Sequence, residues 1–398
     1  MYHGRRVQVP FPGRRPAGKT SASRGAARMG LLIGILVTVV FAFFSQFLGD
    51  NYLELKLLDY RHRNFSDMPV DPAIVHIDID DTSLEQLHRW PWPRRYLARM
   101  IDLCWEAGAR QIVLDMILPE ENAVELTRAD LANVSAFEPV PPIVGEPQVE
   151  VTDNDRLLAQ AMEQAQNVVI PYYAAIQDPA AADAVREKKR LEYQEVKSLI
   201  AADPGAGFEE IYRLLRPGKN IYYRDEEYEA LLNSYIYCLS EYYLSPFFTP
   251  FSPDAVRTRL PGLGPLTFPI PQLARQVSNS GFATAYIDRD GTARRIPLAQ
   301  REGLLHKQLS FAVACRMLGI QDADIDLSHR RKIVIPRLKM EIPLDENGAM
   351  LISWPCGRWE KTGNHYSILL AGKIWMAEKG RQDNQRCLDL METLRYQL

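Results

Sequence analysis

Acidic side chains gather in one short stretch of the sequence and return once downstream. Asp78, Asp80 and Asp81 stand at the end of an apolar run with strand character, and Asp115 stands toward the end of a second one. In open α/β sheets, ligands bind outside the carboxyl ends of neighbouring parallel strands. The spacing therefore predicts that these carboxylates meet at one edge of a sheet, near Arg94 from the intervening segment.

This acidic group permits two interpretations. The carboxylates can cap the segment after the strand by accepting hydrogen bonds from its backbone amides, a common role for aspartate. They can instead line a polar pocket for a ligand or a cation, although an Asp–Arg pair in it could equally lock the loop. The residues of the predicted pocket are Asp80, Asp81, Trp92, Arg94 and Asp115. Packing of the loop is the alternative role for the tryptophan.

The motif D-x-D-x-T at residues 78–82 resembles the first motif of phosphatases of the haloacid dehalogenase type. The resemblance implies that Asp78 would be the nucleophile and Asp80 the general acid, with Mg²⁺ neutralising the phosphate. That chemistry also needs a lysine and a further acidic pair, and no downstream strand supplies them at suitable spacing. We therefore predict a non-enzymatic protein, with a membrane-anchored metal-dependent phosphatase as the alternative.

Other catalytic and metal-binding patterns are missing from the sequence. It contains no P-loop, no G-x-S-x-G elbow and no H-E-x-x-H motif. Its seven histidines lack metal-ligand spacing, and its five cysteines are scattered without a C-x-x-C pair. Neither a cofactor nor a bound metal is expected.

The elements that must position the carboxylates follow a strand–helix–strand pattern. An apolar run at 73–80 predicts a strand, and the Trp-Pro-Trp-Pro block after it cannot be helical. A helix follows from Arg95 to Gly108, and a second strand at 111–118. After a polar loop, a helix capped by Asp153 and a third strand complete a parallel β-α-β-α-β core.

The second half of the chain predicts antiparallel structure and a helical insertion. Asp290–Gly291 is a strong hairpin signal, and its return strand is expected to carry an exposed pair, Arg294 and Arg295. Residues 178–250 are largely helical in pattern and rich in tyrosine. The predicted fold class is therefore α/β, with a mixed sheet built from the parallel core and an antiparallel portion.

The N-terminal region predicts a membrane anchor. Residues 29–48 hold no charged side chain and would span about 30 Å as a helix, the thickness of a hydrocarbon core. The preceding 28 residues hold seven basic side chains and no acidic one, which favours a cytoplasmic N-terminus. A cleaved signal peptide is the alternative, but the segment has no clear small-residue cleavage site.

Several motifs together resemble the CHASE2 domain, an extracytoplasmic sensory module of bacterial membrane receptors. They are L-x-x-L-D-Y-R-x-R at 55–63, I-D-I-D-D at 77–81, W-P-W-P-R at 90–94, D-G-x-x-R-R at 290–295 and DENGAMLIS at 345–353. The resemblance covers roughly residues 50–370, apart from the insertion. It implies a sensor coupled through further membrane helices to a cyclase or kinase output, of which this sequence carries no motif.

The predicted organisation follows from these observations. It comprises a basic cytoplasmic arm (1–28), a transmembrane helix (29–49), a CHASE2-like sensory domain (50–375) with a helical insertion (178–250), and a helical C-terminal tail (376–398). The protein is expected in the inner membrane as a single-pass homodimer with its main domain periplasmic. Expected partners are the membrane, an unknown small-molecule or envelope signal and a separate signalling protein. A net charge of −3 gives no reason to expect nucleic acid. An envelope scaffold that binds through the tyrosine-rich insertion is a further alternative.

Overall fold

The structure of the chain is a computed structural model. It describes residues 21–48, 52–65, 71–87, 90–122, 124–128, 149–177, 187–219, 221, 224–288, 290–352, 364–368, 371–373 and 385. Most of the predicted basic arm, and the predicted C-terminal tail apart from residue 385, lie outside these residues. The chain divides into two units, residues 1–69 with 354–357 and residues 70–353 with 358–398. Each unit is described by itself.

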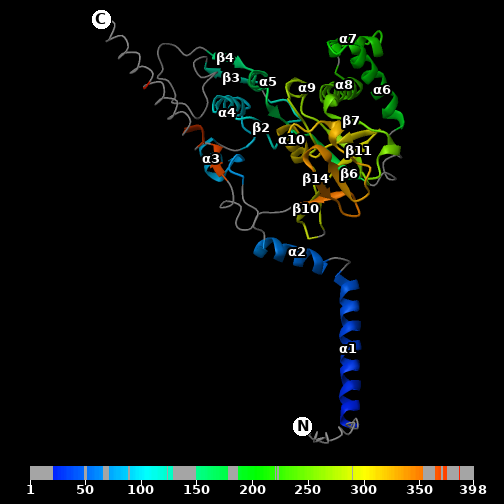
Figure 1. Ribbon diagram of the computed structural model, residues 1–398. Coiled ribbons are helices and arrows are strands. Elements are labelled where there is room, and N and C mark those ends of the chain that lie inside the picture. The colour runs from blue at the N-terminus through cyan, green and yellow to red at the C-terminus, as the bar shows by residue number, and fades with distance from the viewer. Residues whose placement is uncertain are drawn as a thin grey trace, which may run out of the picture. The chain divides into compact units, whose positions relative to one another are not determined.

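The described residues of the first unit form two helices, α1 (Ser21–Leu48) and α2 (Tyr52–Phe65) (Figure 1). The segment predicted to be a membrane helix is thus helical as far as Leu48. Its large apolar side chains between Met29 and Phe43 are 46% to 66% exposed. Among the described residues, no helix meets both the length and the hydropathy that a membrane crossing requires.

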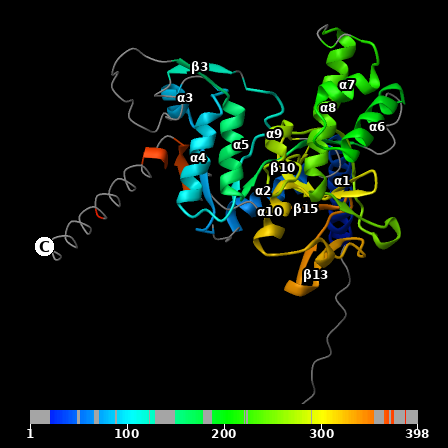
Figure 2. The ribbon, with the colours of Figure 1, turned by 90° about the horizontal axis from the view of Figure 1, so that it is seen from above.

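The second unit begins with a layer of helices over short parallel strands. These elements are β1 (Val75–Asp78), α3 (Asp81–Leu87), α4 (Arg95–Glu106), β2 (Ile112–Val113), α5 (Asn154–Ala165) and β5 (Val168–Val169). Helices α4 and α5 lie side by side (Figure 2), and β2 pairs in parallel with β5. Leu97 and Ile101 of α4 pack with Leu158 and Met162 of α5 in one buried core. The β2–α5–β5 part of the predicted core is therefore confirmed.

The caps of these helices agree with the sequence. Asp153 adopts an extended conformation and accepts a hydrogen bond from the Arg156 amide at 3.0 Å, so it caps α5 as predicted. Gly108 follows α4 with a φ of +82°, a left-handed conformation that glycine adopts without steric cost.

The predicted partner of the first strand is wrong. Instead of β2, strand β1 pairs in parallel with β16 (Asn364–Ser367), in a register that sets Val75 opposite Asn364 and Asp78 opposite Ser367. The blue β1 and the orange-red β16 can be followed side by side in Figure 1. We expected β2 as the partner because it is the next parallel strand in the sequence. The actual partner comes from the far end of the domain, and hydrophobic periodicity does not indicate which strands pair.

A hairpin replaces part of the predicted loop between residues 119 and 152. Strands β3 (Glu125–Arg128) and β4 (Val149–Thr152) pair antiparallel, with Glu125 opposite Thr152. Val-Glu-Val-Thr alternates as a strand does, but proline and acidic residues nearby suggested a loop. The hairpin leads directly into α5.

The remainder of the second unit is largely antiparallel. A five-stranded sheet has the order β6-β8-β11-β12-β7, in which only β8 and β11 run parallel. Its strands are β6 (Tyr173–Gln177), β7 (Thr249–Pro250), β8 (Gly262–Thr267), β11 (Ala299–Arg301) and β12 (Leu304–His306). A three-stranded sheet has the order β15-β10-β9, from β9 (Tyr286–Ile287), β10 (Ala293–Pro297) and β15 (Ala349–Leu351). Further elements are the hairpin β13 (Lys332–Ile335) and β14 (Met340–Pro343), and helices α9 (Pro271–Ala274) and α10 (Leu309–Met317). The mixed α/β class is thus correct.

The segment predicted to be helical contains α6 (Glu187–Ala202), α7 (Phe208–Leu215) and α8 (Glu226–Leu244), packed together at one side of the unit (Figure 2). They share a core of their own, in which Tyr212 and Tyr228 are buried. The rings of these two tyrosines and Phe208 contact one another with centroids 5.1 to 5.8 Å apart. These tyrosines pack helices together.

Candidate functional site

The end of β1 is joined to both α3 and β16 by the carboxylate of Asp80. Its Oδ1 atom accepts hydrogen bonds from the Ser83 amide at 3.0 Å, from the Ser83 hydroxyl, and from the Ser367 hydroxyl at 3.0 Å. Ser83 is completely buried. Burial alone would raise the pKa of Asp80, but these hydrogen bonds favour the charged form and lower it overall. Asp80 therefore caps α3 and also ties it to β16.

Two histidines face each other across the same strand pair. His76 of β1 lies opposite His365 of β16, and their rings are stacked with centroids 4.5 Å apart. His365 Nδ1 is hydrogen-bonded to Asp78 Oδ2 at 2.8 Å. Burial and the neighbouring His365 lower the pKa of His76, while Asp78 opposes that shift. The β1–β16 junction, defined as Asp78, Asp80, Ser83, His76, His365 and Ser367, thus combines hydrogen-bonding and ionisable groups on one face of the strand pair.

Arg94 lies in a separate, buried network. It is 6% exposed, and its Nη1 donates to Asp155 Oδ1 at 2.5 Å, while its Nη2 donates to the Glu120 carbonyl. The other oxygen of Asp155 accepts a hydrogen bond from the Asn122 amide at 2.9 Å. An arginine with a buried carboxylate partner and a carbonyl partner locks the loop at 115–122 against α4 and α5.

The remaining three predicted pocket residues differ in their environment. Trp92 is 2% exposed and packs with Met100, Leu103 and Ile368 in a small apolar cluster. Asp81 is exposed in the first turn of α3, where a carboxylate interacts favourably with the helix dipole. Asp115 is exposed after β2.

The hairpin around Asp290–Gly291 holds a second buried network. Arg294 is only 1% exposed and binds both carboxylate oxygens of Asp290 at 2.8 Å and one oxygen of Asp288 at 2.9 Å. Arg295 pairs with Asp288 at 2.8 Å and with Asp345 at 3.1 Å. The prediction of an exposed arginine pair was therefore wrong. Acidic partners from the same hairpin compensate the charge and allow the guanidinium of Arg294 to be buried.

The arrangement of these motifs in one domain agrees with the comparison with family models. The model of the CHASE2 domain matches residues 34–376, which is most of the chain. The chain belongs to the CHASE2 domain family. This is a family of extracytoplasmic sensory domains without catalytic function. No curated protein and no solved structure matches the chain significantly.

In this CHASE2 domain, the five predicted pocket residues occur in several settings rather than one contact network. Asp80 belongs to the β1–β16 junction, Arg94 to the Asp155 network and Trp92 to an apolar cluster. Within the described part of the chain, no ion pair joins Arg94 to Asp80, Asp81 or Asp115. The hydrogen bonds of Asp80 agree with the interpretation that this carboxylate caps the segment after the strand. The pocket itself stays a prediction.

Sequence reasoning missed the residues that complete both networks. Asp155 carried a weak signal, because an acidic residue in the first turn of a helix is usually assigned to the helix dipole. His365 and Ser367 carried none, because they lie 287 residues beyond their partners Asp78 and Asp80.

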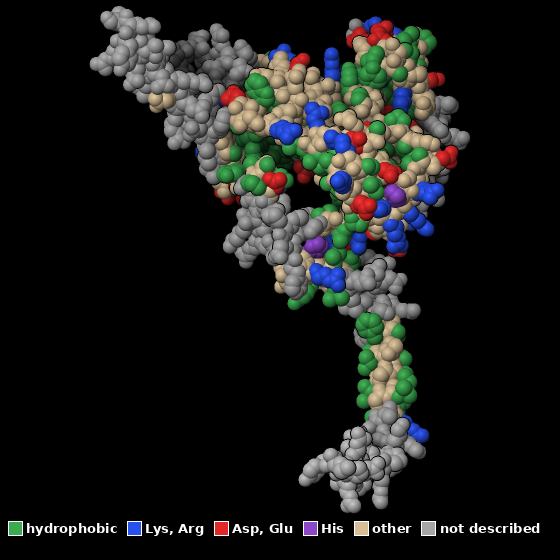
Figure 3. Space-filling view, in the orientation of Figure 1, with side chains coloured by type: hydrophobic (Ala, Val, Ile, Leu, Met, Phe, Trp, Pro, Cys, Tyr) green, Lys and Arg blue, Asp and Glu red, His purple; other side chains and the backbone are tan. Residues whose placement is uncertain are grey.

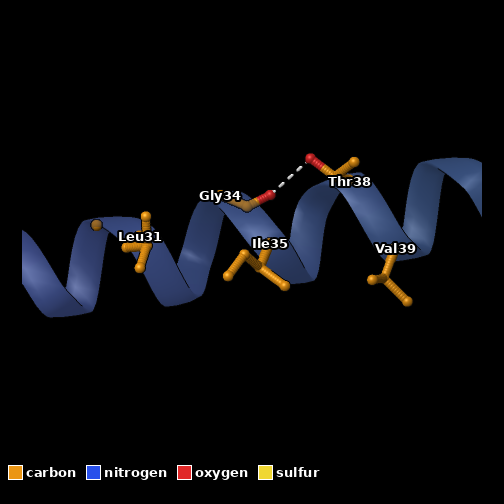
Figure 4. Close-up of a pocket in the computed structure, with 6 residues that line it drawn as sticks. Leu31, Gly34, Ile35, Thr38 and Val39 are labelled. Atoms are coloured by element: carbon orange, nitrogen blue, oxygen red, sulfur yellow. Dashed lines mark hydrogen bonds between the residues drawn. The ribbon is translucent and has the colours of Figure 1, made fainter.

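Two further features bear on chemistry. No group of three or more histidine, cysteine or acidic side chains that could hold a metal occurs among the residues described. On α1, a hollow of about 410 Å³ is lined by Gly30, Leu31, Gly34, Ile35, Thr38 and Val39 (Figure 4). Within this hollow, the Thr38 hydroxyl donates a hydrogen bond to the Gly34 carbonyl at 2.8 Å, so this hydroxyl already has a partner in its own helix.

Proposed function

We propose that the chain is the stimulus-sensing part of a bacterial membrane receptor and passes a conformational change across the membrane to a cyclase- or kinase-type output. The observation that carries this proposal is the β1–β16 junction. It fastens the first strand of the sensory domain to a strand near residue 367, so a stimulus that rearranges the junction reaches both ends of the domain together. Rearrangements of this kind are transmitted because packed elements shift between discrete states.

Membrane attachment through α1 is part of this proposal. It is supported by the charge-free run at residues 29–48, by the large exposure of its apolar side chains and by the basic segment before it. This topology makes the protein single-pass, with a cytoplasmic N-terminus and a periplasmic sensory domain. A homodimer and a separate signalling partner complete the proposed receptor.

The stimulus is proposed to act at the junction. Asp81 is exposed next to Asp80, and Asp78 is half-exposed beside the two imidazoles, so a small molecule or a change in ionisation can reach these groups. Any ligand that binds one arrangement of the junction better than another would shift the population of the two.

Topology is tested with alkaline phosphatase fusions, since this enzyme is active only in the periplasm. Fusions after residue 20 should be inactive and fusions after residue 352 active. An inactive fusion after residue 352, produced at a normal level, would contradict the proposed anchoring.

Sensing is tested by hydrogen exchange of the full chain in lipid nanodiscs, across pH, divalent cations and osmotic strength. At least one stimulus should change exchange of residues 75–78 and 364–367 together. The variant Ser367→Ala keeps the strand backbone but removes the hydroxyl that reaches Asp80, and should uncouple the two responses. Strands that respond independently in the unmodified protein would refute transmission through the junction.

A further inference from the structure

Four exposed arginines lie on two segments that are held together. They are Arg257, Arg259, Arg330 and Arg331, here named the arginine patch. The amides of Arg257 and Thr258 both donate to the Leu327 carbonyl, at 2.9 and 3.1 Å. The Thr258 side chain is buried and its hydroxyl donates to the carbonyl of His329 at 2.7 Å. These bonds fix the 257–259 loop beside the residues that precede β13.

The arginine patch lacks compensating carboxylates among the residues described. None of its four guanidinium groups forms an ion pair there, and the one side-chain hydrogen bond is from Arg259 to the neutral amide of Asn347 at 3.4 Å. Cations next to it are paired, such as Lys332 with Glu341 at 2.7 Å. The acidic Asp326 in the same region is engaged by His329 and by the Ser328 amide.

Uncompensated arginines on a surface create a positive potential that attracts anions. The guanidinium fork matches phosphate oxygens in a bidentate geometry, and arginine is more weakly hydrated than lysine. All four side chains are exposed rather than recessed, whereas sites for small molecules are concave and enclose most of the ligand. A broad array of phosphate groups is therefore a better match than one small anion.

The exposed apolar side chains of the β13–β14 hairpin lie away from the arginine patch, so the attraction of the patch comes from its charge. Leu338 and Met340 are each 37% exposed, but they lie at the turn of the β13–β14 hairpin, whereas Arg330 and Arg331 precede its open end, where Lys332 pairs with Pro343. In the space-filling view, blue Lys and Arg side chains gather on the part of the domain around β14 (Figure 3). Clusters of exposed basic side chains are attracted by the negative potential of an anionic lipid surface.

We propose that the arginine patch docks the sensory domain on the phosphate groups of an anionic lipid bilayer. The inference rests on the proposed membrane attachment, because α1 holds the domain near a bilayer. Docking would restrict the orientation of the domain relative to the membrane. Each basic side chain near an anionic surface favours the docked state by about fivefold, so four favour it by more than a hundredfold.

Energy transfer from the domain to the bilayer tests this proposal. The full chain carries a donor fluorophore on Ser328→Cys, an exposed position beside the patch, and nanodiscs carry a fluorescent lipid acceptor. Cys356 and Cys387 are replaced by serine, while Cys238 and Cys315 are buried and Cys104 is half-buried. Transfer should be high with about 30% phosphatidylglycerol, low with phosphatidylcholine alone, and should fall as added salt shortens the Debye length.

The variant with all four patch arginines changed to glutamine should lose the dependence on phosphatidylglycerol. The matched control changes four other exposed arginines to glutamine, Arg110, Arg156, Arg213 and Arg275, for the same change in net charge. This control should behave like the unmodified protein.

Equal transfer with neutral and anionic bilayers, or loss of transfer in both variants alike, would overturn the proposal. Polyglutamate and inorganic phosphate are added in neutral nanodiscs as separate arms. Patch-dependent binding of polyglutamate without any lipid effect would indicate that the patch binds an acidic protein. Binding of inorganic phosphate alone would indicate that it binds a soluble anion. Either result would contradict lipid docking. The topology fusions and the exchange responses report on the sensory function independently of this outcome.

Discussion

Acidification should destabilise the sensory domain through one buried histidine, His306. This residue is 2% exposed, its ring packs 4.4 Å from that of Phe248, and its Nδ1 is hydrogen-bonded to the Tyr172 hydroxyl at 2.7 Å. Burial, with a smaller contribution from Arg301, lowers the pKa of His306 from 6.5 to about 3. The imidazole is therefore uncharged in the folded protein near neutral pH. As the pH falls below 6.5, the unfolded chain takes up a proton at this residue, whereas the folded protein does so only near pH 3.

The sign and size of the effect follow from this shift. Because the folded pKa lies below the unfolded pKa, the unfolded state binds more protons between pH 6.5 and 3. Stability is thus fully present above pH 6.5 and is lost as the pH falls toward 3. Each pH unit corresponds to about 1.4 kcal/mol, so about 2 kcal/mol of unfolding free energy should be lost between pH 7 and pH 5.

The assay is urea unfolding of the full chain in detergent micelles, followed by tryptophan fluorescence at several pH values. His306→Gln retains a side chain that can accept a hydrogen bond from Tyr172 but does not titrate. Its free energy of unfolding should be lower at pH 7, yet should fall by about 2 kcal/mol less than that of the unmodified protein between pH 7 and pH 5. Equal pH slopes for both proteins would refute the assignment of the acid sensitivity to His306.

Four further substitutions are expected to alter stability, measured by the same urea titrations. Arg94→Ala should cost about 3–5 kcal/mol because it leaves the 4%-exposed carboxylate of Asp155 buried without its partner; a cost below 1 kcal/mol would show that water replaces the guanidinium. Gly348→Ala should prevent stable folding, because its φ is +78° and a Cβ atom would lie 1.8 Å from the carbonyl oxygen of Arg259. Gly303 has a similar φ of +77° but open space around it, so Gly303→Ala should cost only about 1 kcal/mol. Similar losses of stability in the two variants would contradict the close approach at Gly348. Asp80→Ala should cost about 1 kcal/mol and increase hydrogen exchange in α3, and unchanged protection of α3 would exclude the capping role.

The local features of the fold could be predicted from the sequence because their causes are local. The Asp153 cap, the glycine that ends α4 and the hairpin at Asp290–Gly291 each depend on the conformational preferences of one or two residues. The short parallel unit around α5 followed from apolar periodicity. These signals act over a few residues and need no knowledge of distant partners.

The candidate site was predictable only in part, because its contacts are long-range. The acidic stretch at the end of β1 was located correctly, but the hydroxyl and imidazole that bind it lie 287 residues away. The burial of Arg294 depends on two carboxylates folding back over it, which residue type alone does not reveal. Likewise Arg94 was assigned to the nearest acidic cluster, whereas its partner Asp155 is 61 residues further along the chain.

The pairing of β1 with β16 also sets an order for folding. During synthesis from the N-terminus, β1 is made early. Its partner β16 is made only after almost all of the domain. The α4–α5 layer, built from contacts closer in sequence, can form before then, because closing a short loop costs less entropy. During that interval the edge of β1 that pairs with β16 is unpaired, and an unpaired strand edge favours aggregation. The β1–β16 junction is thus the last part of the domain to be completed, so a chain interrupted before Asn364 would hold a packed helical layer without this junction.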